Sequence, residues 1–474
     1  MTPLYPRCAG LDVHKRRVSA CIRLYAGGRT EVHTAVFGTF TRDLEQLRDW
    51  LRQHRVQQVA MESTGVYWIP VWNVLEQSED PLELTLVNPQ HTHALRGHKT
   101  DRQDAGRIAE LLQYGLLRGS FVPPRLVREL RDLTRRRTHV QQDRNRVINR
   151  IARWLEMANI KLGSVVSDLT GKTSTLILHE LCCRGADASE LVKLAQGSLK
   201  HKQDELAESL NGFADDHFRW LLKDMLHELE TLDRKVLQLD RRVADRLHPY
   251  QDLVLRLCTI PGIDFTAASI ILAEVGFDMT RFPTPEHLAS WAGLCPGNNE
   301  SGGKRFSGRT RDGNRYLRRA LVQCAWSILR KKDCFLTAVF HRIASRGGMK
   351  KAAVAVAHRV ILIAWHLIAE GGIYREAGGD YYDRLKPDRT ARRLARRLEQ
   401  IGFQVTLKPL PKIGTAASIP DSQPESKPVL GTNRPAPADP NVCRRCARWK
   451  IPCIHARNAT PQLGGPKPQH QSLT

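Results

Sequence analysis

The sequence predicts an α/β domain with a mixed sheet, followed by a longer and mainly helical part. Residues 9–117 alternate short apolar segments, typical of buried strands, with amphipathic helical segments. Residues 126–162 and 221–247 carry apolar residues at spacings of three and four, as long helices do. A further apolar stretch, 352–369, has the length of a buried helix. These patterns divide the chain into a sheet-bearing N-terminal domain and a helical remainder.

The N-terminal domain is expected to span residues 8–123. Its segments follow the order strand, strand, strand, helix, strand, helix, strand, helix, which implies a mixed sheet with helices packed on it. Gly27-Gly28 marks the turn after the second strand. The expected strands are 9–14, 17–25, 31–37, 56–62 and 82–87, and the expected helices are 41–54, 67–77 and 105–117.

Four acidic residues stand out in this domain because of where they fall. Asp12 lies within the first strand and Glu62 ends the fourth, and a buried charge without a partner is costly. Asp101 and Asp104 open the last helix three residues apart, so they share one face. Taken alone, this pair is better explained as helix capping, because acidic residues are favoured at a helix N-terminus. The two upstream carboxylates shift the balance toward a shared site.

The four carboxylates together predict one cation site. Carboxylates this close repel each other unless a cation lies between them. Hard oxygen ligands suit Mg²⁺ or Mn²⁺. Two such ions about 3.5–4 Å apart would hold the attacking and leaving oxygens of a phosphodiester. Lys99 and Arg102 flank the last pair and are candidate contacts to nucleic acid.

The charge of the chain indicates a polyanionic partner. Its 474 residues include 73 Lys and Arg against 49 Asp and Glu, a net charge of +24, which favours DNA or RNA as the partner. A basic tail on a neutral body does not explain the excess. The basic residues cluster along the chain, at 125–153, 234–246, 305–319 and 389–397.

Secretion and membrane insertion are not expected. The N-terminus lacks the apolar core of a secretory signal. The run 352–369 contains two His and an Arg, which predicts a buried helix and not a membrane span. Most of the 11 Cys stand singly in apolar contexts, among them Cys21, Cys258 and Cys324, as buried thiols in a reducing compartment would. A cytoplasmic protein is therefore expected.

Residues 125–250 are expected to form a helical, coiled-coil region. Apolar spacings of three and four predict two paired long helices, and an ordinary helical bundle within one subunit is an equally good alternative. Arg residues on the outer face are candidate contacts to a nucleic-acid backbone, with a solvated charged face as the alternative for each. They are Arg135, Arg136, Arg137, Arg144, Arg146 and Arg150.

Residues 253–372 form a further expected domain with two phosphate-binding features. A Pro261-Gly262 turn between two helices resembles a helix-hairpin-helix, whose exposed N–H groups bind phosphate, and a plain helix connection is the alternative. Residues 299–319 combine Gly with many cations, so backbone and guanidinium groups can approach phosphates closely. The candidate cations are Lys304, Arg305, Arg309, Arg315, Arg318 and Arg319.

Ser301 stands directly before Gly302-Gly303 in this loop, where its hydroxyl would be exposed. From the residues alone it is best explained as a turn residue. A nucleophilic role would need a base or a metal, and no His adjoins Ser301 in the sequence. Ser307 is a second hydroxyl nearby and a rival for any such role.

The tail, 373–474, is basic, and a basic helix is expected at 391–400. From Lys408 onward it becomes rich in Pro, Ser, Gly and Thr, as flexible segments are. It contains a Cys-x2-Cys pair followed by Cys-x-His, a ligand set that suits tetrahedral Zn²⁺. The second half is more tightly spaced than in common zinc fingers, so a zinc site and a chance cluster are equally good explanations. The residues are Cys443, Cys446, Cys453 and His455.

Several blocks of the sequence resemble the DEDD transposases of bacterial insertion sequences, family one-hundred-and-ten. Three of them occur in order in the N-terminal domain: Gly10-Leu11-Asp12-Val13-His14-Lys15, Met61-Glu62-Ser63-Thr64-Gly65-Val66-Tyr67-Trp68 and Lys99-Thr100-Asp101-Arg102-Gln103-Asp104-Ala105. Two more, at 299–304 and 313–319, resemble the C-terminal transposase domain of that family. The resemblance covers about 9–372 and does not extend to the Cys-rich tail.

The resemblance implies a RuvC-like, ribonuclease-H-like fold for the N-terminal domain, with all four carboxylates as its metal-binding tetrad. It also implies that Ser301 attacks DNA and forms a covalent phosphoserine link. We expect this serine to be activated through the cations of the first domain, including those of another subunit, which would make the active site composite.

The resemblance further implies the partners of the protein. A structured guide RNA encoded by the element would pair with donor and target DNA, which would leave the protein to read backbone and shape. The coiled coil would join a homodimer that assembles into a tetramer. The protein would act in the bacterial cytoplasm, at the nucleoid.

We therefore expect a DNA transposase or recombinase that cuts and rejoins DNA for insertion-sequence mobility. One alternative is a metal-only nuclease of the Holliday-junction-resolvase type, in which Ser301→Ala keeps cleavage and Asp12→Ala abolishes it. Another is a non-catalytic nucleic-acid-binding protein, in which Asp101→Asn leaves function intact. The complete tetrad argues against this second alternative.

Overall fold

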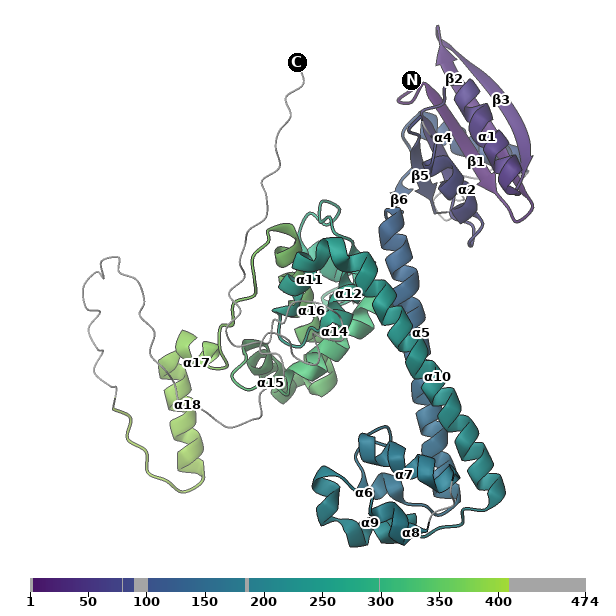
Figure 1. Ribbon diagram of the computed structural model, residues 1–474. Helices are drawn as coiled ribbons and strands as arrows, with labels where there is room; N and C mark the ends of the chain where they lie inside the picture. Colours follow the sequence, from purple (N-terminus) through teal and green to yellow (C-terminus); the bar gives the residue numbers. More distant parts are fainter. Residues whose placement is uncertain (1–2, 79, 89–100, 184–186, 298, 409–474) are drawn as a thin grey trace, which may run out of the picture. The chain divides into compact units, whose positions relative to one another are not determined.

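The structure is a computed structural model that describes residues 3–78, 80–88, 101–183, 187–297 and 299–408. The chain divides after Pro124 into two compact units. The first unit is mixed α/β and the second is mostly helical, which confirms the predicted fold class at this level (Figure 1).

Six strands of the first unit form one sheet in the order β3-β2-β1-β4-β5-β6. β1 pairs antiparallel with β2, and β2 with β3, whereas β1–β4 and β4–β5 are parallel and β5–β6 is antiparallel. The mixed sheet is therefore confirmed. The strands are β1 (Arg7–Val13), β2 (Arg17–Ala26), β3 (Arg29–Gly38), β4 (Gln58–Glu62), β5 (Glu83–Val87) and β6 (Gly119–Ser120).

Helices cover both faces of this sheet. Leu11 and Met61 point to the face covered by α1 (Thr41–Gln53) and α2 (Trp68–Glu76), because they share a buried cluster with residues of these helices. Their neighbours along the strands point to the opposite face, which α4 (Asp101–Gln113) covers. This unit thus has three layers, with α1 and α2 on one side of the sheet and, among the described helices, α4 on the other (Figure 1).

Most boundaries in this unit match the prediction to within two residues, with two differences. The last helix begins at Asp101 and ends at Gln113, four residues before its predicted end, because Gly115 takes a positive φ of 68°. The two-residue strand β6 was not predicted, since so short a segment leaves no alternation to detect.

The second unit is built on two long helices, α5 (Arg125–Met157) and α10 (Asp216–Leu247). They run antiparallel, as shown by ion pairs between Glu129 and Arg246 near one end and between Arg150 and Glu228 near the other. The predicted pairing of long helices is confirmed, and it occurs within one chain. A subunit contact through the same region stays a prediction.

Short helices surround the far end of this pair, where the sequence patterns predicted no individual elements. Val147 and Ile151 of α5 share a buried core there with Leu222 and Leu226 of α10 and with residues of the short helices. These are α6 (Leu162–Val165), α7 (Lys172–Cys183), α8 (Ala188–Val192), η1 (Gly197–His201) and α9 (Gln203–Leu210).

A second buried core lies at the other end of the pair. It includes Leu130 of α5, Val243 of α10 and most of the apolar residues that follow. α16 (Met349–Ala369) is long and apolar enough to cross a membrane, but Val356 and Val360 are fully buried in this core, as predicted for a core helix. The other elements here are η2 (His248–Tyr250), α11 (Gln251–Cys258), α12 (Phe265–Val275), α13 (Pro285–Trp291), α14 (Arg315–Ile328) and α15 (Phe335–Gly347).

One prediction in this unit needs correction. The stretch predicted as one cationic loop contains a hairpin, β7 (Asn299–Ser301) and β8 (Lys304–Ser307), and its last three cations lie on α14. The basic helix predicted at 391–400 is confirmed as the larger part of α18 (Pro387–Gln400), which follows the short α17 (Tyr381–Leu385). Among the predicted buried thiols, Cys21 and Cys324 are buried, whereas Cys258 is only half-buried.

Candidate functional site

Asp12 and Glu62 lie at the ends of adjacent parallel strands. Leu11 of β1 stands opposite Met61 of β4, so the next residues of the two strands are Asp12 and Glu62. Both side chains point toward α4, because Cys8, four residues before Asp12, and Ala60, two residues before Glu62, are buried in one cluster with Ile108 and Leu112 of that helix. The two carboxylates therefore lie on one face and at one edge of the sheet, with the strands about 4.8 Å apart.

Helix α4 brings its N-terminal turn to the same edge. The Cys8 thiol donates to the Ala109 carbonyl at 3.5 Å, and Gly10 lies against both Ala105 and Ala109. Moving forward along β1 thus means moving backward along α4, so the helix runs antiparallel to the strand. The turn that contains Asp104, and the backbone of Asp101, consequently lies toward Asp12.

The Asp12 side chain is enclosed and lies against a histidine. It is 6% exposed, and its Oδ2 lies 3.1 Å from Nε2 of His14. Among the described side chains, no three His, Cys, Asp or Glu lie close enough together to hold a metal ion. The side chains of Asp101 and Arg102, and the whole of Lys99, lie outside the described residues. The sequence prediction assigned no role to His14, which the turn after β1 brings back onto Asp12.

Gly10 sets the distance between β1 and α4. A Cβ added there would lie 2.3 Å from the Ala109 amide nitrogen and 2.4 Å from the Ala105 carbonyl oxygen, closer than real contacts. We predict that Gly10→Ala pushes α4 from the sheet and lowers the free energy of unfolding in urea by about 1–3 kcal/mol, the usual range for overpacking.

Gly106, which lies on α4, provides the matched control for Gly10 on β1. A Cβ there would meet only the Cys21 sulfur, at 3.9 Å. Gly106→Ala should therefore stabilise the protein, by about 0.5–1 kcal/mol, because Ala is the better helix former. Equal stabilities for the two variants would contradict the close packing of α4 on β1.

Ser301 lies at the tip of the β7–β8 hairpin. It pairs with Lys304 across the two-residue turn of Gly302 and Gly303, whose φ angles are +58° and +75°. Two positive φ angles define a type I′ turn, which glycine adopts without strain. The side chains of Ser301, Lys304, Arg305 and Ser307 lie outside the described residues. The backbone alone thus presents Ser301 immediately before a tight turn.

The base of this hairpin is closed by close backbone contacts. The Gly297 amide donates to the Arg309 carbonyl at 2.9 Å. Further down, a Cβ on Gly313 would lie 2.4 Å from the Gly293 nitrogen, so only glycine fits at this crossing. The segment from Gly297 to Arg309 therefore begins and ends at neighbouring positions in the fold.

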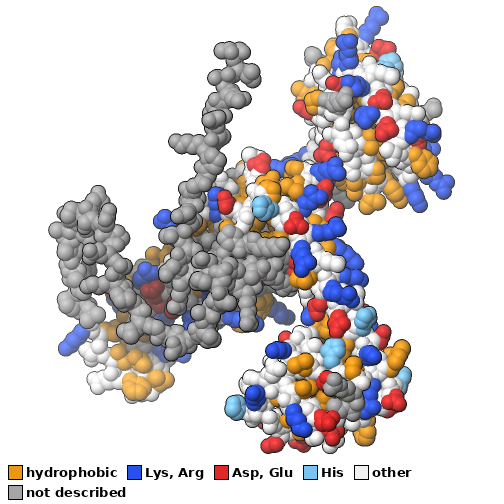
Figure 2. All heavy atoms as spheres, in the orientation of Figure 1, with side chains coloured by type: hydrophobic (Ala, Val, Ile, Leu, Met, Phe, Trp, Pro, Cys, Tyr) orange, Lys and Arg blue, Asp and Glu red, His pale blue; other side chains and the backbone are white. Residues whose placement is uncertain are grey.

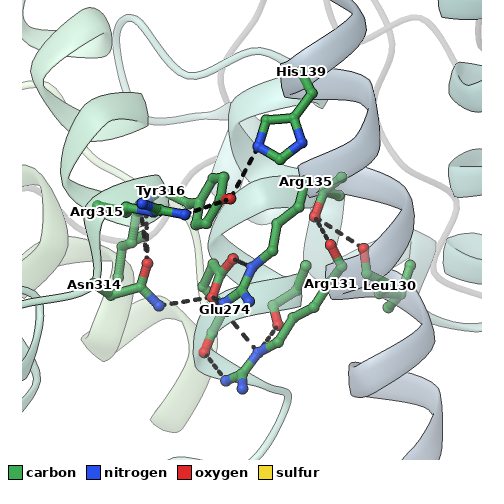
Figure 3. Close-up of polar contacts among 11 residues, drawn as sticks. Leu130, Arg131, Arg135, His139, Glu274, Asn314, Arg315 and Tyr316 are labelled. Carbon is green, nitrogen blue, oxygen red and sulfur yellow. Dashed lines mark hydrogen bonds and ion pairs between the residues drawn. The ribbon is translucent and has the colours of Figure 1, made fainter. Parts of the chain in front are cut away.

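The chain after the hairpin reaches Asn314, the N-cap of α14, whose side chain is hydrogen-bonded to a buried carboxylate (Figure 3). The Glu274 side chain on α12 is 0% exposed. Arg135 of α5 donates to both of its oxygens at 2.8 Å, and Asn314 Nδ2 donates to Oε2 at 2.6 Å. The hydrogen bonds to Glu274 raise the pKa of Arg135. Sequence reasoning missed this group, because its members are far apart in the chain.

An aromatic ring joins the same cluster on its outer side. The guanidinium groups of Arg135 and Arg315 lie 4.7 Å and 5.0 Å from the centroid of Tyr316. His139 Nε2 lies 3.1 Å from the Tyr316 hydroxyl (Figure 3). Of the predicted cations, Arg309, Arg315 and Arg319 are exposed and Arg318 is half-buried.

Contact between the α5 arginines and a nucleic acid stays a prediction, but most of these side chains are paired within the protein. Five of the six residues proposed as backbone contacts pair with a carboxylate: Arg135 with Glu274, Arg137 with Asp240, Arg144 with Asp233, Arg146 with Asp143 and Arg150 with Glu228. Figure 2 accordingly shows acidic side chains next to the basic ones along the long helices. Three of these guanidinium groups, Arg137, Arg144 and Arg150, pair with carboxylates of the antiparallel partner α10 and so support helix pairing. The partner of Arg135 lies on α12, and that of Arg146 lies on α5 itself.

The predicted helix-hairpin-helix connection is present between α11 and α12, but it carries its own anion. The Asp264 side chain accepts the Ala267 amide at 2.9 Å and so caps α12. A carboxylate at that position opposes phosphate binding at the helix N-terminus. The candidate zinc ligands Cys443, Cys446, Cys453 and His455 lie outside the described residues.

Two family models match the chain. Residues 9–160 match the model of DEDD transposases of the IS110 type, described as a transposase. Residues 254–339 match the model of the transposase IS116/IS110/IS902 family. All four tetrad positions fall in the first matched segment, and Glu274, Ser301 and Asn314 fall in the second.

Curated relatives extend this similarity across both segments. A probable family 20 transposase of Pseudomonas aeruginosa is 26% identical over 338 residues, which are 70% of this chain and 89% of the relative. The transposase for insertion sequence element IS1111A of Coxiella burnetii is 27% identical over 305 residues, 61% of this chain and 72% of the relative. A pilin gene-inverting protein of Moraxella lacunata is 23% identical over 382 residues, 76% and 95% of the two chains.

Proposed function

Because the chain belongs to the IS110 family of transposases, enzymes that cleave DNA and transfer its strands, we propose that it mobilises an insertion sequence by metal-dependent cleavage with Ser301 as the nucleophile. The observation that carries the metal-dependent part is the convergence of Asp12, Glu62 and the first turn of α4 at one edge of a mixed sheet. The proposal is also supported by the strand order of this sheet, β3-β2-β1-β4-β5-β6, which is compatible with a RuvC-like domain.

The donor set fits a hard divalent cation. Transposases with this tetrad generally depend on a divalent metal. Asp12, Glu62, Asp101 and Asp104 would hold Mg²⁺ or Mn²⁺ through oxygen atoms alone. A cation bound there supplies charge stabilisation for the oxygens of the phosphodiester. His14 beside Asp12 would hold that carboxylate in place when the cation is absent.

The proposed covalent step is a transesterification at phosphorus. The Ser301 Oγ forms a bond to the phosphorus, and the bond between phosphorus and one deoxyribose oxygen breaks. The proton of the serine hydroxyl is lost to solvent or a base, and the released deoxyribose oxygen takes up a proton. The phosphoserine link conserves one phosphodiester for each one broken, so the reverse reaction can rejoin DNA without a further energy source.

The proposed partners follow from the family and from the distribution of charge. DNA is the substrate of transposases. We propose in addition a structured guide RNA and a homodimer that assembles into a tetramer. The net charge of +24 and the exposed Arg309, Arg315 and Arg319 support contacts to a nucleic-acid backbone, which hold the duplex without reading its sequence.

The test is a trapping experiment on the full chain. The protein is incubated with labelled DNA from the ends of its element, RNA transcribed from the flank of its gene and Mg²⁺, and then denatured. We expect labelled DNA that migrates with protein, and no such species with EDTA. Cut DNA without attached protein would contradict the serine mechanism and would support the alternative of a metal-only nuclease. If the DNA is not cut at all, the result would support the alternative of a non-catalytic nucleic-acid-binding protein.

A further inference from the structure

Glu274 is the most enclosed acidic side chain of the second unit, and it lies beside the serine hairpin's point of return. A buried carboxylate is costly unless it is paired and hydrogen-bonded. Glu274 is fully satisfied: Arg135 binds both oxygens, and Asn314 donates to Oε2. Arg131 adds donors to the backbone carbonyls of Ala273 and Glu274, at 2.9 and 2.5 Å.

Three elements meet at Glu274, and each supplies a different group. α12 supplies the carboxylate, α5 supplies both guanidinium groups, and Asn314 begins α14. Asn314 has two separate functions, because its Oδ1 accepts the amides of Tyr316 and Leu317 as the helix cap while its Nδ2 binds Glu274. One side chain thus joins the helix cap to the buried carboxylate (Figure 3).

We propose that Glu274 is a positioning residue for strand cleavage, which acts through Asn314 to fix the hairpin that carries Ser301. This inference rests on the proposed role of Ser301. The hairpin segment returns to the fold at Gly313, where contact with Gly293 leaves no space for a side chain. Asn314 is the next residue, so its directional hydrogen bond to Glu274 sets the point from which the segment projects.

A second ion pair on α5 provides a control that distinguishes a positioning role from a contribution to stability. Arg137 of α5 pairs with Asp240 of α10, whose side chain is 3% exposed. This pair is also a buried guanidinium–carboxylate contact, and it joins α5 to α10. Asp240→Asn should therefore reduce thermal stability without altering the hairpin.

The decisive variant is Asn314→Asp. Aspartate keeps the capping oxygen for the Tyr316 and Leu317 amides, but it loses the Nδ2 donor and puts a second carboxylate against Glu274. We expect hydrogen exchange in 297–313 to rise and the single-turnover rate of serine–DNA adduct formation to fall about 10- to 100-fold, as for a small misplacement of a reacting group. The affinity for the same DNA should be unchanged.

A double variant tests whether the effect passes through Glu274. Glu274→Gln alone leaves Arg135 without a buried anion and is expected to unfold the region. In Glu274→Gln combined with Asn314→Asp, the amide and the carboxylate exchange places, so a hydrogen bond between positions 274 and 314 is restored and Arg135 keeps an anion nearby. We expect this variant to recover the low exchange of 297–313 and most of the adduct rate.

Each outcome bears on the proposal. Adduct rates that fall equally in Asn314→Asp and Asp240→Asn would overturn it, because both would then reflect stability alone. Unchanged exchange of 297–313 in Asn314→Asp would overturn it as well. If the wild-type protein forms no adduct with the DNA, the serine mechanism fails, but hydrogen exchange still decides whether Glu274 holds the hairpin.

Discussion

Ser301→Ala is expected to abolish the covalent protein–DNA species, by at least about 10³-fold, as removal of a nucleophile does in other covalent enzymes. The physical reason is that the phosphodiester then has no hydroxyl at the hairpin tip to attack it. DNA affinity should persist, since exposed cations such as Arg315 and Arg319 are unchanged. The measurement is a denaturing gel of labelled element-end DNA, together with an equilibrium binding assay.

Ser307→Ala is the control for this prediction. Ser307 ends the opposite strand of the same hairpin, where it pairs with Asn299. This variant should form the adduct at the wild-type rate. An adduct that survives in Ser301→Ala and disappears in Ser307→Ala would transfer the nucleophilic role to the rival hydroxyl.

Asp12→Asn is expected to stop cleavage and to weaken binding of the divalent cation. The substitution keeps the shape of the buried side chain and removes one negative charge from the proposed cation site. Loss of several kcal/mol of charge stabilisation corresponds to a fall in rate of about 10³-fold or more. The readouts are single-turnover cleavage and the increase in melting temperature that Mg²⁺ produces without DNA, which should be present in the wild type and absent in the variant.

Glu83→Gln is the matched control, because it removes a carboxylate from the opposite edge of the same sheet. Glu83 begins β5, whereas the proposed metal ligands stand at the strand ends, and its Oε2 accepts a hydrogen bond from Gln58 at 2.6 Å. Cleavage and the Mg²⁺-dependent melting temperature should both match the wild type. A loss of the Mg²⁺ effect in Glu83→Gln as well would show that net charge, and not the proposed site, determines cation binding.

The sheet and its carboxylates could be predicted from the sequence because the signals are local. Alternating or continuous apolar residues define each strand of the first unit, and an acidic residue such as Asp12 inside one of them is conspicuous. That two such strands end side by side follows from parallel pairing, which the intervening helices require. The direction of α4 could not be predicted, since it depends on the fit of Gly10 against Ala105 and Ala109.

The surroundings of the serine were harder to predict because their contacts are distant in the chain. Glu274 lies in an apolar helix, and nothing near it in the sequence indicates that Arg135, 139 residues earlier, binds both of its oxygens. The α5 arginines show the converse problem. A cationic helix predicts a nucleic-acid surface when it is read alone, and only the antiparallel register with α10 reveals that carboxylates such as Asp233 neutralise it.

The two buried cores at opposite ends of the α5–α10 pair have a consequence for how this enzyme can evolve. One core contains Leu130 and Val243, the other contains Val147 and Leu226, and no buried residue belongs to both. A replacement in the far core is therefore absorbed there, without repacking the core that supports the serine hairpin. The sequence and length of the lobe formed by α6–α9 can therefore change with little effect on the cleavage reaction. We expect natural variation in chain length to accumulate in that lobe.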